Sequence, residues 1–158
     1  MRRLLVPLAA LALASCSKAS VRPGSTVKLF YTAFVDGAAY DSNEGSDGIR
    51  ITQGRRELVP GLDDGLLGMK TGETKDILVP PERGYGERDP KAIESMPLKD
   101  FGELAARLSP GATVHGMRGG KAAEAKVVSV ENGKAVLDFN HPLAGKTVRF
   151  RVRVAEIR

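Results

Sequence analysis

Residue types that commonly hold metals or act as nucleophiles are scarce in this chain of 158 residues. It contains one cysteine, Cys16, and two histidines, His115 and His141, which are 26 positions apart. Structural and catalytic metal sites need three or four protein ligands, so we expect no metal and no cofactor, with a two-histidine site as the alternative. His141 stands between Asn140 and Pro142, a context that favours a turn residue bonded to the backbone.

The setting of Cys16 indicates an export signal. Arg2 and Arg3 precede an apolar run over residues 4–13, and Ala14 and Ser15 lead to the cysteine. The run is roughly half of the ~20 residues that a membrane-spanning helix needs, so the layout is that of a secretory signal over residues 1–15. One alternative is an ordinary signal in which the cysteine is incidental, and another is an uncleaved anchor.

The segment resembles a bacterial lipobox, in which the cysteine receives a diacylglycerol and becomes the first residue. The resemblance implies a lipid attached at Cys16 and a protein that is exported, held at a bacterial membrane and facing the periplasm. Ser17 follows the cysteine where many inner-membrane lipoproteins have aspartate, which favours the outer membrane. Residues 16–25, which are small and polar, are predicted to be a tether.

The charge of the chain gives no reason to expect a nucleic-acid partner. Lys and Arg number 24 against 19 acids, and loss of Arg2 and Arg3 with the signal lowers the formal charge from +5 to +3. Near the end of the chain Arg149, Arg151 and Arg153 alternate with apolar residues. This pattern predicts a strand with one buried and one solvated face.

The remaining chain predicts a mixed α and β fold. Residues 27–35 alternate as a strand and end at the hairpin signal Asp36-Gly37. Further strands are expected over residues 49–52, 75–79 and 146–158. Pro60 opens a short helix, because proline is favoured at the first helical position.

A stretch of different character interrupts this pattern. Residues 88–140 contain three short predicted strands, over 112–117, 122–130 and 135–139, and the turn Asn132-Gly133 joins the last two. Hairpins set between two strands of another unit indicate an inserted domain. We therefore divide the chain into a signal (1–15), a tether (16–25), a discontinuous domain (26–87 and 141–158) and an insert (88–140).

The order and spacing of several motifs resemble the FKBP-type peptidyl-prolyl cis/trans isomerases. These motifs are Tyr31 with Asp36-Gly37, Tyr40-Asp41-Ser42, Leu58-Val59-Pro60-Gly61-Leu62, the turn Gly68-Met69-Lys70-Thr71-Gly72-Glu73, Pro80-Pro81-Glu82-Arg83-Gly84-Tyr85-Gly86 and Leu143-Ala144-Gly145. The place of the insert is similar to that in SlyD-like members of the family. Those members carry a chaperone domain, called insert-in-flap, at this point.

The resemblance implies an α+β fold, with an antiparallel sheet wrapped around one short helix and an inserted small β-rich domain. It also implies a pocket for the substrate proline. Carried over by position, the catalytic side chains are Tyr31, Asp41, Tyr85 and Phe150, and the substrate-binding side chains are Tyr40, Ile51, Leu58, Val59 and Leu62. Leu62 stands where many members have a tryptophan floor, and Tyr40 where phenylalanine is usual. The His- and Cys-rich tail that binds nickel in SlyD is missing after Arg158.

Several of these residues also have a simpler explanation. The aliphatic and aromatic ones could fill the core between sheet and helix, and Asp41 could serve a turn. Tyr85 lies between two glycines, which makes a purely packing role harder to defend.

The expected reaction needs no acid, base or metal. Rotation about the X-Pro bond has a barrier of about 18 to 20 kcal/mol from amide resonance, and a dry pocket lowers it by withdrawing water from the carbonyl oxygen. We therefore predict a monomeric isomerase that assists folding of exported proteins and acts on unfolded or proline-containing polypeptides. The alternative is a membrane-anchored holdase or binding module with little isomerase activity.

Overall fold

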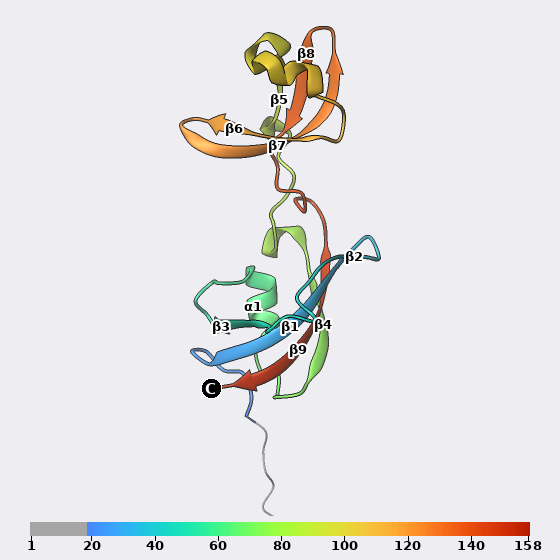
Figure 1. The fold of residues 1–158 in the computed structure, drawn as a ribbon. Helices are drawn as coiled ribbons and strands as arrows, with labels where there is room; N and C mark the ends of the chain where they lie inside the picture. Colours follow the sequence, from blue (N-terminus) through green and yellow to red (C-terminus); the bar gives the residue numbers. More distant parts are fainter. Residues whose placement is uncertain (1–18) are drawn as a thin grey trace, which may run out of the picture.

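A computed structural model describes residues 19–158, which form two antiparallel sheets (Figure 1). The first sheet has five strands in the order β2-β1-β9-β4, with β3 also paired to β1. Its strands are β1 (Thr26–Val35), β2 (Ala38–Ser42), β3 (Ile49–Thr52), β4 (Thr74–Val79) and β9 (Val148–Ile157). One α-helix, α1 (Pro60–Leu66), lies against this sheet.

The two central strands have the alternation that the sequence predicts. Val152 and Val154 of β9 are fully buried, whereas Arg151 is exposed. The outward arginines form ion pairs, Arg151 with Asp76 on β4 and Arg153 with Glu44. The prediction of one buried and one solvated face is confirmed.

Helix α1 packs unusually closely on β4 because two of its residues are glycines. A Cβ at Gly65 would lie 2.6 Å from Cγ2 of Ile77, and one at Gly61 would lie 2.8 Å from Cγ1 of Val79. Pro60 occupies the start of the helix, as expected. This close approach fixes the loop before the helix, which carries Leu58 and Val59.

The second sheet is formed by the inserted stretch. Its order is β5-β8-β7-β6, with β5 (Ile93–Pro97), β6 (Thr113–Arg118), β7 (Lys121–Glu131) and β8 (Lys134–Asp138). Asn132 and Gly133 have φ values of 50° and 73°, as the predicted tight hairpin between β7 and β8 requires. Strand β5 was not predicted as a strand. The α+β fold class with a second, inserted sheet is confirmed.

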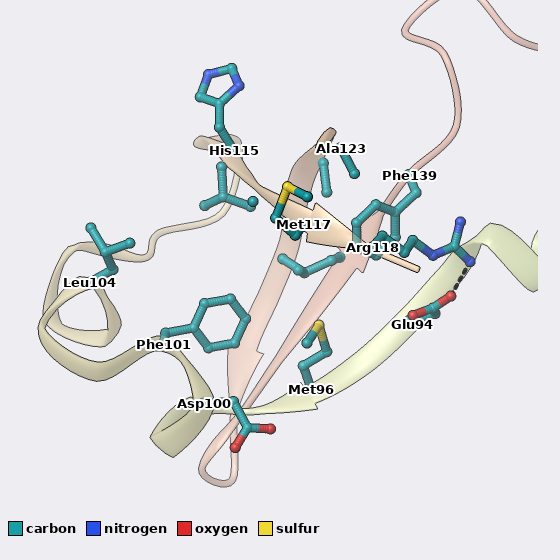
Figure 2. A pocket seen from close by; sticks show the side chains of 14 residues that line it. Glu94, Met96, Asp100, Phe101, Leu104, His115, Met117, Arg118, Ala123 and Phe139 are labelled. Carbon is teal, nitrogen blue, oxygen red and sulfur yellow. Dashed lines mark hydrogen bonds and ion pairs between the residues drawn. The ribbon is translucent and has the colours of Figure 1, made fainter. Parts of the chain in front are cut away.

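The second sheet has its own core and an open apolar pocket. Ala125, Val127, Ala135 and Leu137 are buried in a cluster separate from that of the first sheet. Three short 3-10 helices, η1 (Pro81–Arg83), η2 (Pro90–Ala92) and η3 (Leu98–Arg107), complete the elements. Figure 2 shows side chains of β5, β6 and η3 around a pocket beside this sheet.

Part of the predicted tether packs on the first sheet's domain. Val21 is 2% exposed, its N–H donates to the carbonyl of Met69, and its own carbonyl accepts from Gly68. The segment from residue 19 therefore begins against the domain, at the end of the molecule opposite the second sheet (Figure 1). The signal and Cys16 lie outside the described residues. Among residues 19–158, no helix is long and apolar enough to span a membrane.

Candidate active site

A cavity of about 220 Å³ opens between the concave face of the first sheet and the start of α1. Strand β1 contributes Tyr31 to its wall and β9 contributes Phe150. Leu58 and Val59, just before the helix, close another side, and Leu62 of the helix is 3% exposed at the bottom. Most of the lining is apolar, so a group that enters the cavity loses contact with water.

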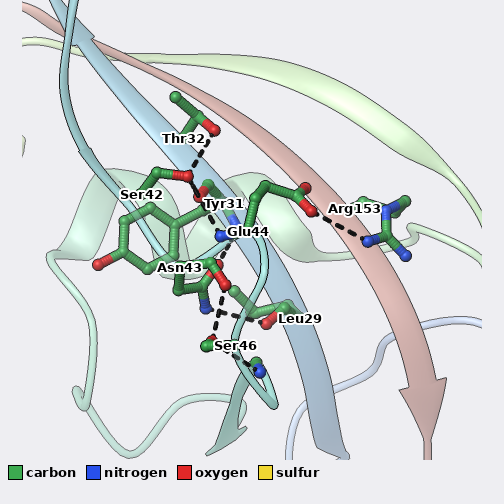
Figure 3. Close-up of polar contacts among 9 residues, drawn as sticks. Leu29, Tyr31, Thr32, Ser42, Asn43, Glu44, Ser46 and Arg153 are labelled. Carbon is green, nitrogen blue, oxygen red and sulfur yellow. Dashed lines mark hydrogen bonds and ion pairs between the residues drawn. The ribbon is translucent and has the colours of Figure 1, made fainter.

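Tyr31 is held in place by the loop that follows β2. Its backbone N–H donates to Oδ1 of Asn43 at 2.6 Å, and its carbonyl accepts from the N–H of Asn43 at 3.1 Å and from Oγ of Ser42 at 3.1 Å (Figure 3). The Asn43 side chain also donates to the carbonyl of Leu29 at 3.3 Å. Arg153 pairs with Glu44 of the same loop. These contacts fix the end of β2, which carries Asp41, against β1.

The phenol of Tyr31 is committed to Asp41. Its hydroxyl donates to Oδ2 of the carboxylate at 2.7 Å, and its ring meets Phe150 edge to face, with centroids 6.1 Å apart. The hydrogen bond to Asp41, burial and the carboxylate's charge raise the pKa of Tyr31 to about 12. Tyr31 is therefore neutral at physiological pH, and its hydroxyl proton is engaged in the hydrogen bond to Asp41.

Tyr85 faces the same cavity from the segment that leads to the insert. The N–H groups of Gly84 and Gly86, on either side of it, both donate to the carbonyl of Pro81. Burial, followed by the nearby charge of Asp41, raises the pKa of Tyr85. Its hydroxyl donates to no other residue among those described, so this phenol is free to bind a ligand in the cavity.

Comparison with known proteins agrees with this geometry. The family model for FKBP-type peptidyl-prolyl cis-trans isomerase matches residues 17–153. The chain belongs to this family. The match includes the second sheet, the first sheet up to the middle of β9 and all of the side chains of the cavity, so the isomerase domain and its insert are aligned together.

Similar proteins place the chain among the SlyD-like and short-type FKBP isomerases. A short-type peptidyl-prolyl cis-trans isomerase of Methanocaldococcus jannaschii is 29% identical, with 87% of this chain and 94% of that protein covered. SlyD of Aeromonas hydrophila is 33% identical over 87% of this chain, which spans 65% of its length. The 16 kDa FKBP-type isomerase of Escherichia coli K12 is 28% identical, with 87% and 94% covered. The chain is an FKBP-type peptidyl-prolyl cis-trans isomerase.

The FKBP cavity brings together eight of the nine residues predicted from sequence. They are Tyr31, Tyr40, Asp41, Leu58, Val59, Leu62, Tyr85 and Phe150. The ninth, Ile51, is buried in the core cluster and does not line the cavity. Ile49, two residues earlier on the same face of β3, lines the cavity instead. The first residue of β3 is therefore at the cavity, and the part of the strand that carries Ile51 is in the core.

Sequence reasoning missed four lining residues: Ala33, Ile49, Glu57 and Leu143. Ala33 follows Tyr31 at the period of a strand, and Glu57 precedes Leu58, so both had local signals. Leu143 is separated from Tyr85 by the whole insert. Its only signal was its place in the motif Leu143-Ala144-Gly145 after the insert.

The two histidines make contacts other than metal ligation among the described residues. Within the described part of the FKBP chain, no group of three or more His, Cys, Asp or Glu side chains is arranged to hold a metal ion. His115 pairs with Glu124 at 3.6 Å. Nδ1 of His141 accepts from the backbone N–H of Leu143 at 3.1 Å, which confirms the prediction of a turn residue bonded to backbone.

The Tyr31–Asp41 pair makes a testable prediction about pH. Because the folded pKa of Tyr31 is raised to about 12 from an ordinary value of about 10, its contribution to stability is complete below about pH 10. That contribution is lost as the pH rises towards 12. Ultraviolet titration of tyrosinate should contain a late component that Tyr31→Phe removes, and Asp41→Asn should lower the midpoint of that component. An unchanged midpoint for Tyr31 in Asp41→Asn would contradict the assignment to this pair.

Proposed function

We propose that the FKBP cavity holds the substrate proline and that Tyr31, Asp41, Tyr85 and Phe150 carry out the isomerase function. The observation that carries this assignment is the difference between the two phenols of the cavity. The Tyr31 hydroxyl donates to Asp41, whereas the Tyr85 hydroxyl lies at the apolar cavity and is free to donate to a ligand. The reactive carbonyl would therefore meet Tyr85.

In this mechanism the pocket acts on the amide without covalent chemistry. Phe150, Val59 and Leu62 clamp the proline ring and exclude water, and the planar amide loses the hydration that favours its charge-separated form. The preceding residue then turns about the C–N bond. Each ~1.4 kcal/mol removed from the barrier gives a tenfold gain in rate.

We further propose that the insert binds unfolded polypeptide through the pocket beside its sheet. This pocket has a volume of about 290 Å³. Figure 2 shows Met96, Phe101 and Met117 directed at it. Met117 is 71% exposed and Leu104 is 54% exposed. Exposure of these apolar side chains to water is unfavourable, and an apolar partner that covered them would remove this cost. Methionine side chains adapt to partners of varied shape.

The rim of this pocket is charged. Arg118 forms an ion pair with Glu94 at one end, and Asp100 lies at another (Figure 2). An apolar floor with a polar rim is typical of protein-binding surfaces. Extended segments of an unfolded chain offer apolar side chains and polar backbone in the same way.

A pair of matched variants tests the insert pocket. Leu104→Glu combined with Met117→Glu should weaken binding of a reduced, carboxymethylated unfolded protein by about tenfold or more, since each buried aliphatic side chain contributes about 1.5 to 3 kcal/mol. Val128→Glu is the control, because Val128 is 47% exposed on β7 and does not line the pocket. Binding would be measured by fluorescence anisotropy. Equal loss in the control, or none in the double variant, would contradict the proposal.

We also propose that the protein is exported and anchored through Cys16, on the basis of the signal layout over residues 1–15. Its role would then be to assist the folding of exported proteins from the surface of a bacterial membrane. Val21 is fixed on the domain, so few residues separate the domain from such an anchor. The insert would be held far from the membrane.

The anchor is tested by mass spectrometry of the membrane fraction. Acyl chains are expected on Cys16 as the first residue, and Cys16→Ala should release the protein or block its processing. Ser17→Ala serves as the control and should leave the acylation intact. A soluble product without acyl groups, cleaved elsewhere, would contradict the proposal.

A further inference from the structure

His141 contacts two walls of the proline cavity from outside it. Its ring stacks on Tyr85, with centroids 4.4 Å apart and planes at 9°. Its Nδ1 accepts the backbone N–H of Leu143 at 3.1 Å. Tyr85 and Leu143 both line the cavity, whereas His141 does not. One side chain thus contacts the proposed donor and the apolar wall beside it.

The backbone around His141 is fixed on both sides. The N–H of Gly145 donates to the carbonyl of Gly86 at 2.8 Å, which joins the two segments that lead to and from the insert. Beyond His141, the Asn140 side chain accepts from the N–H of Asp89 at 2.8 Å and donates to its carbonyl at 2.9 Å. The ring is therefore held against Tyr85 by a neck with hydrogen bonds at each end.

The hydrogen bond to Leu143 defines the protonation state of the imidazole. Because Nδ1 accepts an N–H, the ring is neutral and carries its proton on Nε2. A second proton would occupy Nδ1 and meet the N–H of Leu143, so this bond would be lost. Leu143 is 3% exposed, and its backbone N–H would then need another partner.

We propose that His141 is a positioning residue of the isomerase site: in its neutral form it orients Tyr85 and Leu143, and protonation breaks its hydrogen bond to Leu143. The inference rests on the assignment of the cavity to the substrate proline. It adds to the site a residue on the segment that directly follows the insert. It also makes the shape of the pocket depend on pH.

Other charged groups near His141 must be considered in a pH dependence. His141 borders a polar cavity of about 500 Å³ at the neck. Its titratable and charged lining consists of Tyr40, Arg88, Glu124, Lys126, Asp138 and Lys146. Arg88 pairs with Asp138, and Lys146 pairs with Asp36.

Asp138, one of these neighbours, has a pKa that moves away from neutral pH. Burial opposes the charge of Asp138, but hydrogen bonds from Asn140 and Arg88 outweigh it and lower its pKa. Histidine is the side chain type whose charge ordinarily changes between about pH 8 and pH 5. A transition that depends on the imidazole is therefore identified by its loss in variants without that ring.

Two substitutions separate the two contacts of His141. His141→Phe keeps a ring to stack on Tyr85 but has no acceptor and no titration, whereas His141→Asn keeps an oxygen near the place of Nδ1 without the ring. With an uncharged X-Pro peptide, wild-type kcat/KM should fall by about two- to twelvefold when the imidazole is protonated. His141→Phe should lose a similar factor at pH 8 and show a flat profile, and His141→Asn should also have a flat profile.

Nuclear magnetic resonance gives a readout that does not need isomerase activity. As the Cε1 proton of His141 titrates, the amide proton of Leu143 and the ring protons of Tyr85 should shift with the same midpoint, and the amide spectrum shows that each variant is folded. Independent midpoints, or a wild-type pH profile in His141→Phe, would overturn the proposal. Coupled resonances with a pH-independent wild-type activity would also overturn the positioning role. Failure of the cavity assignment itself would appear separately, in variants of Phe150.

Discussion

Phe150→Ala is expected to lower kcat/KM by more than the roughly two- to twelvefold loss expected for Tyr85→Phe. Phe150 is 3% exposed and meets Tyr31 edge to face, so its removal opens the cavity to water and frees the ring that orients Tyr31. Tyr85→Phe removes one phenol hydrogen bond and leaves the aromatic surface. The comparison therefore separates desolvation from hydrogen bonding. Relaxation of a short X-Pro peptide between its cis and trans forms measures both.

The stability of these variants must be measured beside their activity. Truncation of a buried phenylalanine typically costs about 3 to 5 kcal/mol of unfolding free energy, enough to unfold a marginal domain. Phe150→Leu keeps an apolar side chain of similar volume and serves as the folded control. If Tyr85→Phe abolished activity while a folded Phe150→Leu retained it fully, hydrogen bonding would be the main effect and the desolvation mechanism would be wrong.

Replacing residues 88–140 with a short turn is expected to leave peptide isomerisation nearly intact and to reduce catalysis of protein folding on the order of 100-fold. A bound client presents its prolines to the cavity at a high effective concentration, and loss of the second site removes that gain. The replacement is geometrically feasible because the N–H of Gly145 already bonds the carbonyl of Gly86 across the neck. His141, Leu143 and the hydrogen bond between Gly145 and Gly86 remain in the shortened chain, whereas the hydrogen bonds between Asn140 and Asp89 are lost.

The assay compares a tetrapeptide with a protein whose refolding is limited by one X-Pro bond. Leu104→Glu with Met117→Glu should reproduce the loss on the protein substrate without the deletion. Equal loss on peptide and protein would mean that the insert forms part of the catalytic pocket. No loss on the protein would remove the case for a polypeptide-binding insert.

The local patterns of the sequence determined most of the elements. Alternation of apolar and polar residues over 27–35 and 148–157 gives each strand one apolar face that must be buried in a core. Pro60 has a fixed φ that suits the start of a helix. Asn132-Gly133 tolerates the positive φ values of a tight hairpin. Such signals depend only on residues that are near one another in the chain, so these elements can be predicted without knowledge of the rest of the fold.

Only the tertiary structure decided which side chains meet in the FKBP cavity. Alternation puts Ile49 and Ile51 on one face of β3 but does not say which end of that face reaches the cavity. The choice depends on the register of β3 with β1, where Ile51 lies opposite Val27. The burial of Val21 likewise depends on contacts with Met69, far along the chain.

The contacts of His141 also could not be predicted from the sequence. In the sequence it is one polar residue before Pro142, and its local signal indicated a turn, which is correct. Its stacking on Tyr85 joins residues 56 positions apart, with a separately packed sheet between them. No periodicity spans that distance, because the two segments are brought together only when the insert folds and its ends meet at the neck.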